Sequence, residues 1–146
     1  MARRQILSKD VNAGIERVNK EKKTIIMDPI LRLFPFMCAA LIVHLVEEIH
    51  TGFRRKFPLG EMPRSVFVTV NIIVYSWALA AYLSYFFNHP WGPSLVFIFS
   101  LAVLGNGLFH LGYMVLHRRY FPGGITAGAL VPLGGVTMLC AARHLL

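Results

Sequence analysis

The chain has 146 residues, of which 55% are hydrophobic and only 15% are charged, and its mean hydropathy is +0.56. A soluble domain of this size is usually about a quarter charged, so the composition excludes such a domain and indicates an integral membrane protein. The net charge of +8 does not indicate a nucleic-acid partner, because the Lys and Arg residues form short clusters beside apolar blocks, as they do at membrane-span ends and against anionic lipids.

Residues 1–28 form a polar, basic segment that precedes the first apolar block. Val11, Ile15 and Val18 share one face at helical spacing, which favours a short amphipathic helix on the membrane surface. A disordered tail, cytoplasmic or interfacial, is the alternative. The proline that follows Asp28 marks the boundary, because a residue before proline avoids the α conformation.

Four apolar blocks follow within residues 29–146, each about 20 to 26 residues long, which is enough for one membrane-spanning helix. Their expected ranges are 31–50, 65–87, 92–117 and 124–145. The sequence therefore predicts an all-α fold, an integral membrane bundle of four transmembrane helices that follows a short basic N-terminal segment.

The distribution of positive charge predicts the orientation of this bundle. If the four helices alternate in direction, nine Lys or Arg residues lie on the side of the N-terminal segment and six lie on the other side. The cytoplasmic side of a membrane protein carries the excess of Lys and Arg. We therefore expect a multi-pass protein of the cell inner membrane with both termini in the cytoplasm.

The stretch from His44 to Glu48, with the sequence HLVEE, ends the first apolar block. His44, Glu47 and Glu48 stand at positions i, i+3 and i+4, so one face of a helix carries all three. A charged carboxylate in hydrocarbon is unfavourable by a few kcal/mol, and a cluster of this kind therefore indicates a functional site. The alternative is that the two glutamates mark the end of the helix that is exposed to water.

Other polar residues are expected at the depth of this motif. At 1.5 Å per residue, His44 and His110 both lie roughly 10–12 Å below the membrane face that carries the first and third loops. Asn71 in the second block and Thr126 in the fourth are expected at a similar depth. Each helix thus offers a polar side chain to one layer. The residues that we expect to be catalytic are His44, Glu47, Glu48 and His110.

Two polar rows extend this layer along the second and third blocks. Asn106, His110 and Tyr113 share one helix face at offsets 0, 4 and 7, and Asn71 and Tyr75 do so at offset 4. Such rows face the interior of a bundle, since lipid disfavours them. Hydrogen bonding between helices is the alternative role for these side chains. The residues expected to bind a substrate are Asn71, Tyr75, Asn106, Tyr113 and Thr126.

Three motifs stand in order along the chain: HLVEEIHTGF at 44–53, NGLFH at 106–110 and YFPGGITA at 120–127. With them, residues 31–135 resemble the HXXEE family of small bacterial membrane proteins. The resemblance implies a multi-helix membrane domain centred on the motif residues. It implies no particular reaction.

The cluster fits a metal site. Imidazole and carboxylate ligands together suit zinc or iron, and catalytic zinc commonly takes three protein ligands and a water. A glutamate that is not a ligand could serve as general base to the bound water, as in a membrane hydrolase or hydroxylase. The expected ligands of a mononuclear metal are His44, His110 and one or both of Glu47 and Glu48.

The same cluster also fits a metal-free mechanism. At least one of two neighbouring carboxyl groups in a low dielectric should stay protonated near neutral pH. A neutral carboxylic acid in an apolar pocket can protonate an alkene or epoxide while its partner removes a proton. This chemistry would suit a cyclase or isomerase of an isoprenoid-like substrate.

Both mechanisms describe a membrane-embedded enzyme that acts on a lipophilic or amphiphilic small molecule. Basic residues at the mouth, including Arg54 and Arg118, hint at an anionic head group. Outside the enzymes, a proton-coupled transporter and a structural membrane subunit are the alternatives, because buried acids and histidines also form proton paths. Four helices are few for alternating access, so a transporter would need a homodimer.

Overall fold

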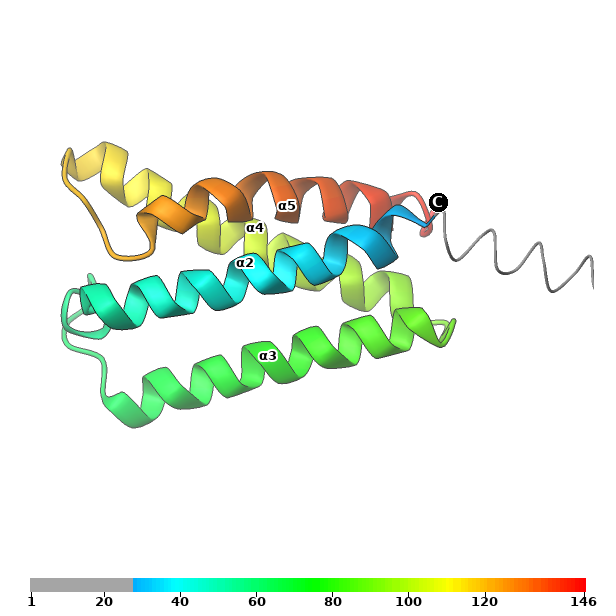
Figure 1. The fold of residues 1–146 in the computed structure, drawn as a ribbon, viewed down its shortest axis with the longest axis horizontal. Coiled ribbons are helices and arrows are strands. Elements are labelled where there is room, and N and C mark those ends of the chain that lie inside the picture. The colour runs from blue at the N-terminus through cyan, green and yellow to red at the C-terminus, as the bar shows by residue number, and fades with distance from the viewer. Residues whose placement is uncertain (1–27) are drawn as a thin grey trace, which may run out of the picture.

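The computed structural model describes residues 28–146. In this part of the chain, four long α-helices and one short 3-10 helix follow one another: α2 (Pro29–Thr51), η1 (Phe53–Arg55), α3 (Arg64–Phe86), α4 (Gly92–His117) and α5 (Gly124–Ala142). The four long helices form a bundle (Figure 1). The predicted bundle of four helices is confirmed, although the last helix ends at Ala142 rather than near Leu145. The amphipathic helix expected before Asp28 lies outside the described residues.

Each of these four helices is long and apolar enough to cross a membrane. Their outward faces carry large exposed apolar side chains, for example Ile42, Ile72 and Leu139. Such faces suit contact with lipid chains, because a helix satisfies most of its interior backbone N–H and C=O groups through its own hydrogen bonds. The chain is therefore a multi-pass membrane protein.

Local sequence explains where α2 begins and ends. Pro29 stands in the first turn, where its missing N–H is not needed, and the Asp28 carboxylate accepts a hydrogen bond from Ile30 N at 2.8 Å. At the other end Gly52 adopts φ 73°, a left-handed conformation that closes helices. These two caps set the length of the helix that carries the HLVEE motif.

The helices are unevenly packed around the bundle. Helix α5 packs closely against α4 and also against α2, whereas α3 lies against α4 and contacts α2 at only a few points. Only Ala78 and Ala81 of α3 are buried. The seam between α2 and α3 is therefore loosely closed.

The apolar core is centred on Phe34. Its ring centroid lies 5.6 Å from that of Phe99 and 5.7 Å from that of Tyr82, which joins α2 to α4 and α3. The loops after α2 and α4 lie together at the other end of the bundle (Figure 1). Near them, the buried side chains include the polar residues His44, Glu48 and His110. The helices thus pack together around the apolar core at one end of the bundle, and the motif residues lie at the other end.

Candidate functional site

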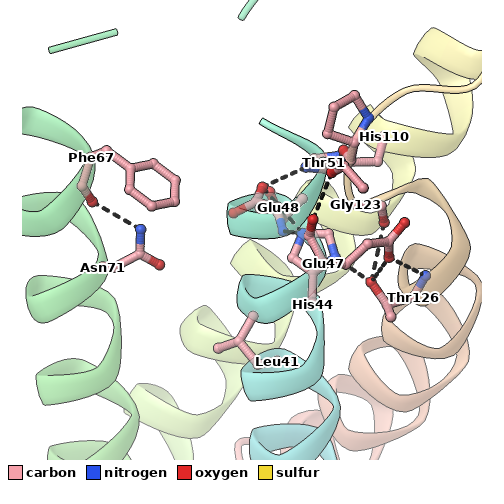
Figure 2. A network of polar contacts seen from close by, with 12 residues as sticks. Leu41, His44, Glu47, Glu48, Thr51, Phe67, Asn71, His110, Gly123 and Thr126 are labelled. Atoms are coloured by element: carbon pink, nitrogen blue, oxygen red, sulfur yellow. Dashed lines mark hydrogen bonds and ion pairs between the residues drawn. The ribbon is translucent and has the colours of Figure 1, made fainter. Parts of the chain in front are cut away.

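Three ionisable side chains meet at the motif end of the bundle. His44 and Glu48 of α2 and His110 of α4 have exposed fractions of 2%, 8% and 0%. Glu48 Oε1 lies 3.4 Å from His44 Nε2 and 3.2 Å from His110 Nε2 (Figure 2). The two imidazole rings meet edge to face, with centroids 4.6 Å apart. One carboxylate oxygen therefore faces the Nε2 atoms of both histidines.

Hydrogen bonds fix the orientation of the His44 ring. His44 Nδ1 lies 2.8 Å from the Thr126 hydroxyl oxygen, and that hydroxyl donates to Glu47 Oε2 at 2.6 Å in preference to Gly123 O at 3.3 Å. Because the hydroxyl proton is directed at Glu47, Thr126 accepts the proton of His44 Nδ1–H. The Asn106 amide nitrogen, 3.1 Å from His44 Nε2, agrees with a lone pair on that atom. In this tautomer, His44 turns Nε2 toward Glu48.

The His110 ring is also oriented by a hydrogen bond at Nδ1. His110 Nδ1 lies 2.6 Å from the Pro122 carbonyl oxygen, and because a carbonyl only accepts, Nδ1 carries the proton. Its Nε2 is buried and has no assigned hydrogen-bond partner among residues 28–146, although Glu48 Oε1 lies 3.2 Å away. Buried polar atoms without a partner are uncommon, and a bound ion or water is one way to satisfy them.

Gly123 allows the two imidazoles to approach each other. Its φ of +84° lies in the left-handed region that favours glycine. A Cβ at this position would lie 2.6 Å from His44 Cε1 and 2.7 Å from His110 Nδ1, which is too close for either ring. Neither Pro122 nor Gly123 signals chemistry in a sequence, and only their place in the YFPGGITA motif points to them.

Glu47 is directed at the beginning of α5 (Figure 2). Its carboxylate accepts hydrogen bonds from the backbone N–H groups of Ile125 at 3.2 Å and Thr126 at 2.9 Å, and from the Tyr120 hydroxyl at 2.6 Å. Partial burial and the bond to Glu47 raise the pKa of Tyr120 above its usual range, so this phenol stays a donor. Glu47 therefore caps α5 from another helix and, through Thr126, orients His44.

An apolar pocket of about 450 Å³ adjoins the buried carboxylate. Its walls come from α2, α3, α4 and the loop after η1, and His44, Glu48 and Asn106 line one side of it. Pockets of this size with a few convergent polar groups are typical of small-molecule sites. The cluster thus has a compartment beside it that an apolar molecule can fill.

Two of the residues expected to bind a substrate line this pocket from the side of α3. Asn71 donates from Nδ2 to the carbonyl oxygen of Phe67 at 2.9 Å, within its own helix. The Tyr75 hydroxyl donates to the carbonyl oxygen of Leu41 in α2, also at 2.9 Å. Neither side chain is in hydrogen-bond contact with the histidines, and Tyr75 links α3 to α2.

Tyr113 does not line the pocket. Its ring lies toward the α4–α5 loop, 3.9 Å from the centroid of His117 and 4.2 Å from that of Phe121. The rings of Phe53 and Phe121 instead surround His110, each with a centroid distance of 5.3 Å. These phenylalanines exclude water from the buried imidazole, and both lie within the sequence motifs.

The three buried side chains form a potential metal-ligand set. The ligand atoms of His44, Glu48 and His110 all lie within 4.8 Å of one another. Ligands about 2.1 Å from a tetrahedral metal lie about 3.4 Å apart, which matches the observed N–O separations of 3.4 and 3.2 Å. Each histidine also donates Nδ1–H to an oxygen, as metal-bound histidines usually do. Two imidazoles and one carboxylate could hold zinc or iron and leave a position for water or substrate.

Residues 35–137 match the model of a family described as proteins of unknown function with an HXXEE motif. The matched range contains all three side chains of the cluster, together with Thr126 and Gly123. No curated protein and no solved structure matches the chain. The family resemblance seen in the sequence is confirmed: this chain belongs to the HXXEE family.

Proposed function

We propose that this protein is a membrane-embedded enzyme that acts on a lipophilic small molecule through a mononuclear metal bound by His44, Glu48 and His110. One observation carries the proposal: Nε2 of both histidines faces the same carboxylate oxygen, while Nδ1 of both is engaged elsewhere. The adjoining pocket of about 450 Å³ gives the substrate a place beside that oxygen.

The ligand set fits a catalytic metal better than a structural one. Three protein ligands leave a coordination position for water or substrate, whereas structural zinc is closed by four. A cation here also offsets the charge of a buried carboxylate, which is otherwise unfavourable in a low dielectric. Zinc would supply an activated water for hydrolysis, and iron(II) with two histidines and one carboxylate suits hydroxylation.

The remaining polar residues support this site. Asn106 lies beside His44 Nε2 and lines the pocket, so its amide is placed to orient a substrate next to the metal. We assign Glu47 and Thr126 a positioning role, because their hydrogen bonds fix the tautomer of His44. This division gives the two adjacent glutamates different tasks.

Metal analysis tests the proposal. Protein purified in a mild neutral detergent should contain about one zinc or iron per chain. Glu48→Gln and His110→Ala should each lower the metal affinity at least a hundredfold, since even outer-shell changes lower it about 10–100-fold. His117→Ala is the matched control, because His117 is exposed on the same helix outside the cluster. Folded protein that binds neither metal when each is supplied would rule out the metal site.

A metal-free acid–base enzyme is the second candidate. It is supported by the 3.2 Å approach of Glu48 Oε1 to His110 Nε2, a pair that can share one proton beside the pocket. The pair would then protonate and deprotonate an isoprenoid-like substrate during cyclisation or isomerisation. Absence of metal, together with loss of turnover in Glu48→Gln, would favour this candidate over the first.

We also propose that the protein lies in the cell inner membrane with both termini in the cytoplasm. The excess of Lys and Arg on the side of the termini supports this orientation. The cluster would then lie near the opposite face of the membrane.

A further inference from the structure

Three pockets follow one another along the seam between α2 and α3. The first, about 410 Å³, lies at the end of α2 and the start of α3. The second is the pocket of about 450 Å³ beside the cluster, and the third, about 370 Å³, lies farther along the same two helices. The first and second share Glu48 and Phe67 as lining residues, and the second and third share Tyr75. Adjacent pockets thus share lining residues and together mark a path along the seam, which the hydrogen bond from the Tyr75 hydroxyl to Leu41 O crosses where the second and third pockets meet.

The first pocket is cationic. Arg54, Arg55 and Arg64 all line it. Arg54 is paired with Glu61 at 3.0 Å, but Arg55 and Arg64 are exposed and have no ion-pair or hydrogen-bond partner within residues 28–146. Guanidinium groups bind phosphate and carboxylate with paired hydrogen bonds. Two unengaged arginines at a pocket therefore suit an anionic group.

The rest of the path is long and mainly apolar. The second and third pockets follow α2 from Glu48 back to Phe34, a distance of 14 residues. At 1.5 Å per residue this is about 21 Å, or roughly two thirds of a hydrocarbon core about 30 Å thick. The third pocket is lined only by apolar side chains, a cysteine and two tyrosines. A single alkyl or isoprenoid chain fits these dimensions.

We propose that the substrate is a single-chain amphiphile with an oxyanion head group that lies along this seam. Its head contacts Arg55 and Arg64, the first part of its chain passes Glu48, and its end lies beyond Tyr75. The molecule enters sideways from the membrane, because α2 and α3 contact each other at only a few points. The reaction at Glu48 rests on the proposed function, whereas binding along the seam does not.

Quenching of Trp77 measures this binding directly. Trp77 lines the second pocket, and the other tryptophan of the chain, Trp91, is 67% exposed at the start of α4. In a Trp91→Phe protein held in neutral detergent, hexadecyl phosphate brominated at mid-chain should quench Trp77 saturably. The brominated hexadecyl trimethylammonium ion should bind at least about tenfold more weakly, because its head is cationic.

Variants at both ends of the path test where head and chain lie. Arg55→Gln and Arg64→Gln should each lower the affinity for hexadecyl phosphate about tenfold. Arg119→Gln removes the same charge outside the three pockets and should leave that affinity unchanged. Cys38→Phe fills the third pocket and should weaken hexadecyl phosphate but not octyl phosphate. Ala39→Phe, on an exposed neighbour, is its control.

Each contrary result would contradict a different part of the proposal. Equal quenching by the phosphate and ammonium probes would contradict the proposal that the seam binds an anionic amphiphile. Displacement of the probe by inorganic phosphate at the same concentration would contradict it too. An unchanged affinity of Cys38→Phe for hexadecyl phosphate would show that the alkyl chain does not occupy the third pocket. The titration needs neither metal nor turnover, so it is repeated in His110→Ala. Retained binding there is the expected result. Binding of the probe by wild-type protein that takes up neither zinc nor iron would reject the proposed function alone, and metal binding without probe binding would reject this inference alone.

Discussion

Glu48 is a carboxylic acid whose ionised form is disfavoured by its burial. It is 8% exposed, and its ion pairs within residues 28–146 are both with histidines. An unpaired carboxylate in such surroundings would be unfavourable by several kcal/mol. Because both histidines direct Nδ1–H away from it, the compensating charge must come from a further proton or from a cation between the three side chains. In either case Glu48 is the centre of the proposed site.

Gly123 decides whether the two imidazoles can meet, and Gly123→Ala should separate them. The new Cβ would lie within 2.7 Å of atoms in both rings, at a φ of +84° that alanine adopts only at an energy of about 1–2 kcal/mol. We expect the metal affinity to fall at least tenfold, measured by competition with a chromogenic chelator, and the melting temperature to fall as well.

Gly128→Ala is the matched control for this change. It lies in the same helix region, and a Cβ there would meet nothing within 4 Å. Alanine in a helix interior is more favourable than glycine by about 0.5–1 kcal/mol, so this variant should keep its metal and melt no earlier. Wild-type metal binding by Gly123→Ala would contradict the assigned arrangement of the rings.

At the scale of the helices, much of the arrangement was predictable from the sequence. The apolar blocks are each long enough for one span, and that length alone indicates four helices. The rise of a helix also places His44 and His110 at one depth, and the structure brings their rings together. Length and rise are properties of a single helix, which is why the sequence is sufficient for them.

The rotation of each helix and the shape of its loops were not predictable in the same way. Adjacent residues on a helix point about 100° apart, so the direction of Glu47 and Glu48 depends on what packs against α2. The structure turns Glu48 to His110 and Glu47 to α5. Likewise Asn71 shares the expected depth but stands across the pocket, because α3 is held against α4 rather than α2.

Helix α5 has no side-chain cap from its own segment, and Glu47 of α2 supplies one. Glu47→Ala would leave the N–H groups of Ile125 and Thr126 without their acceptor and remove a charge that stabilises the positive end of the helix. We expect a loss of about 1–3 kcal/mol in the free energy of unfolding, measured in detergent.

Glu61→Ala is the control for this loss. Glu61 is exposed, and within residues 28–146 its one ion pair is with Arg54 in the loop before α3. Surface ion pairs contribute about 0–1 kcal/mol. Removal of Glu61 should hardly change the unfolding midpoint. If both variants unfolded alike, the carboxylate of Glu47 would not be what holds α5 against α2.

At the scale of the whole molecule, the cluster lies near one end of the bundle and Asp28 and the C-terminus lie at the other (Figure 1). The loops after α2 and α4 close the end that carries the site, so substrate and water reach it either from that face or from within the membrane. Under the proposed function, orientation therefore decides which compartment supplies water to the site.

Cysteine labelling in intact cells determines that orientation. In a Cys38→Ala, Cys140→Ala background, Leu59→Cys and Leu146→Cys place single thiols at fully accessible positions, since these leucines are 90% and 109% exposed. With both termini in the cytoplasm, a membrane-impermeant maleimide should label Leu59→Cys in intact cells and Leu146→Cys only after lysis. The reverse pattern would place the arginines of the first pocket and the buried cluster at the cytoplasmic face of the membrane.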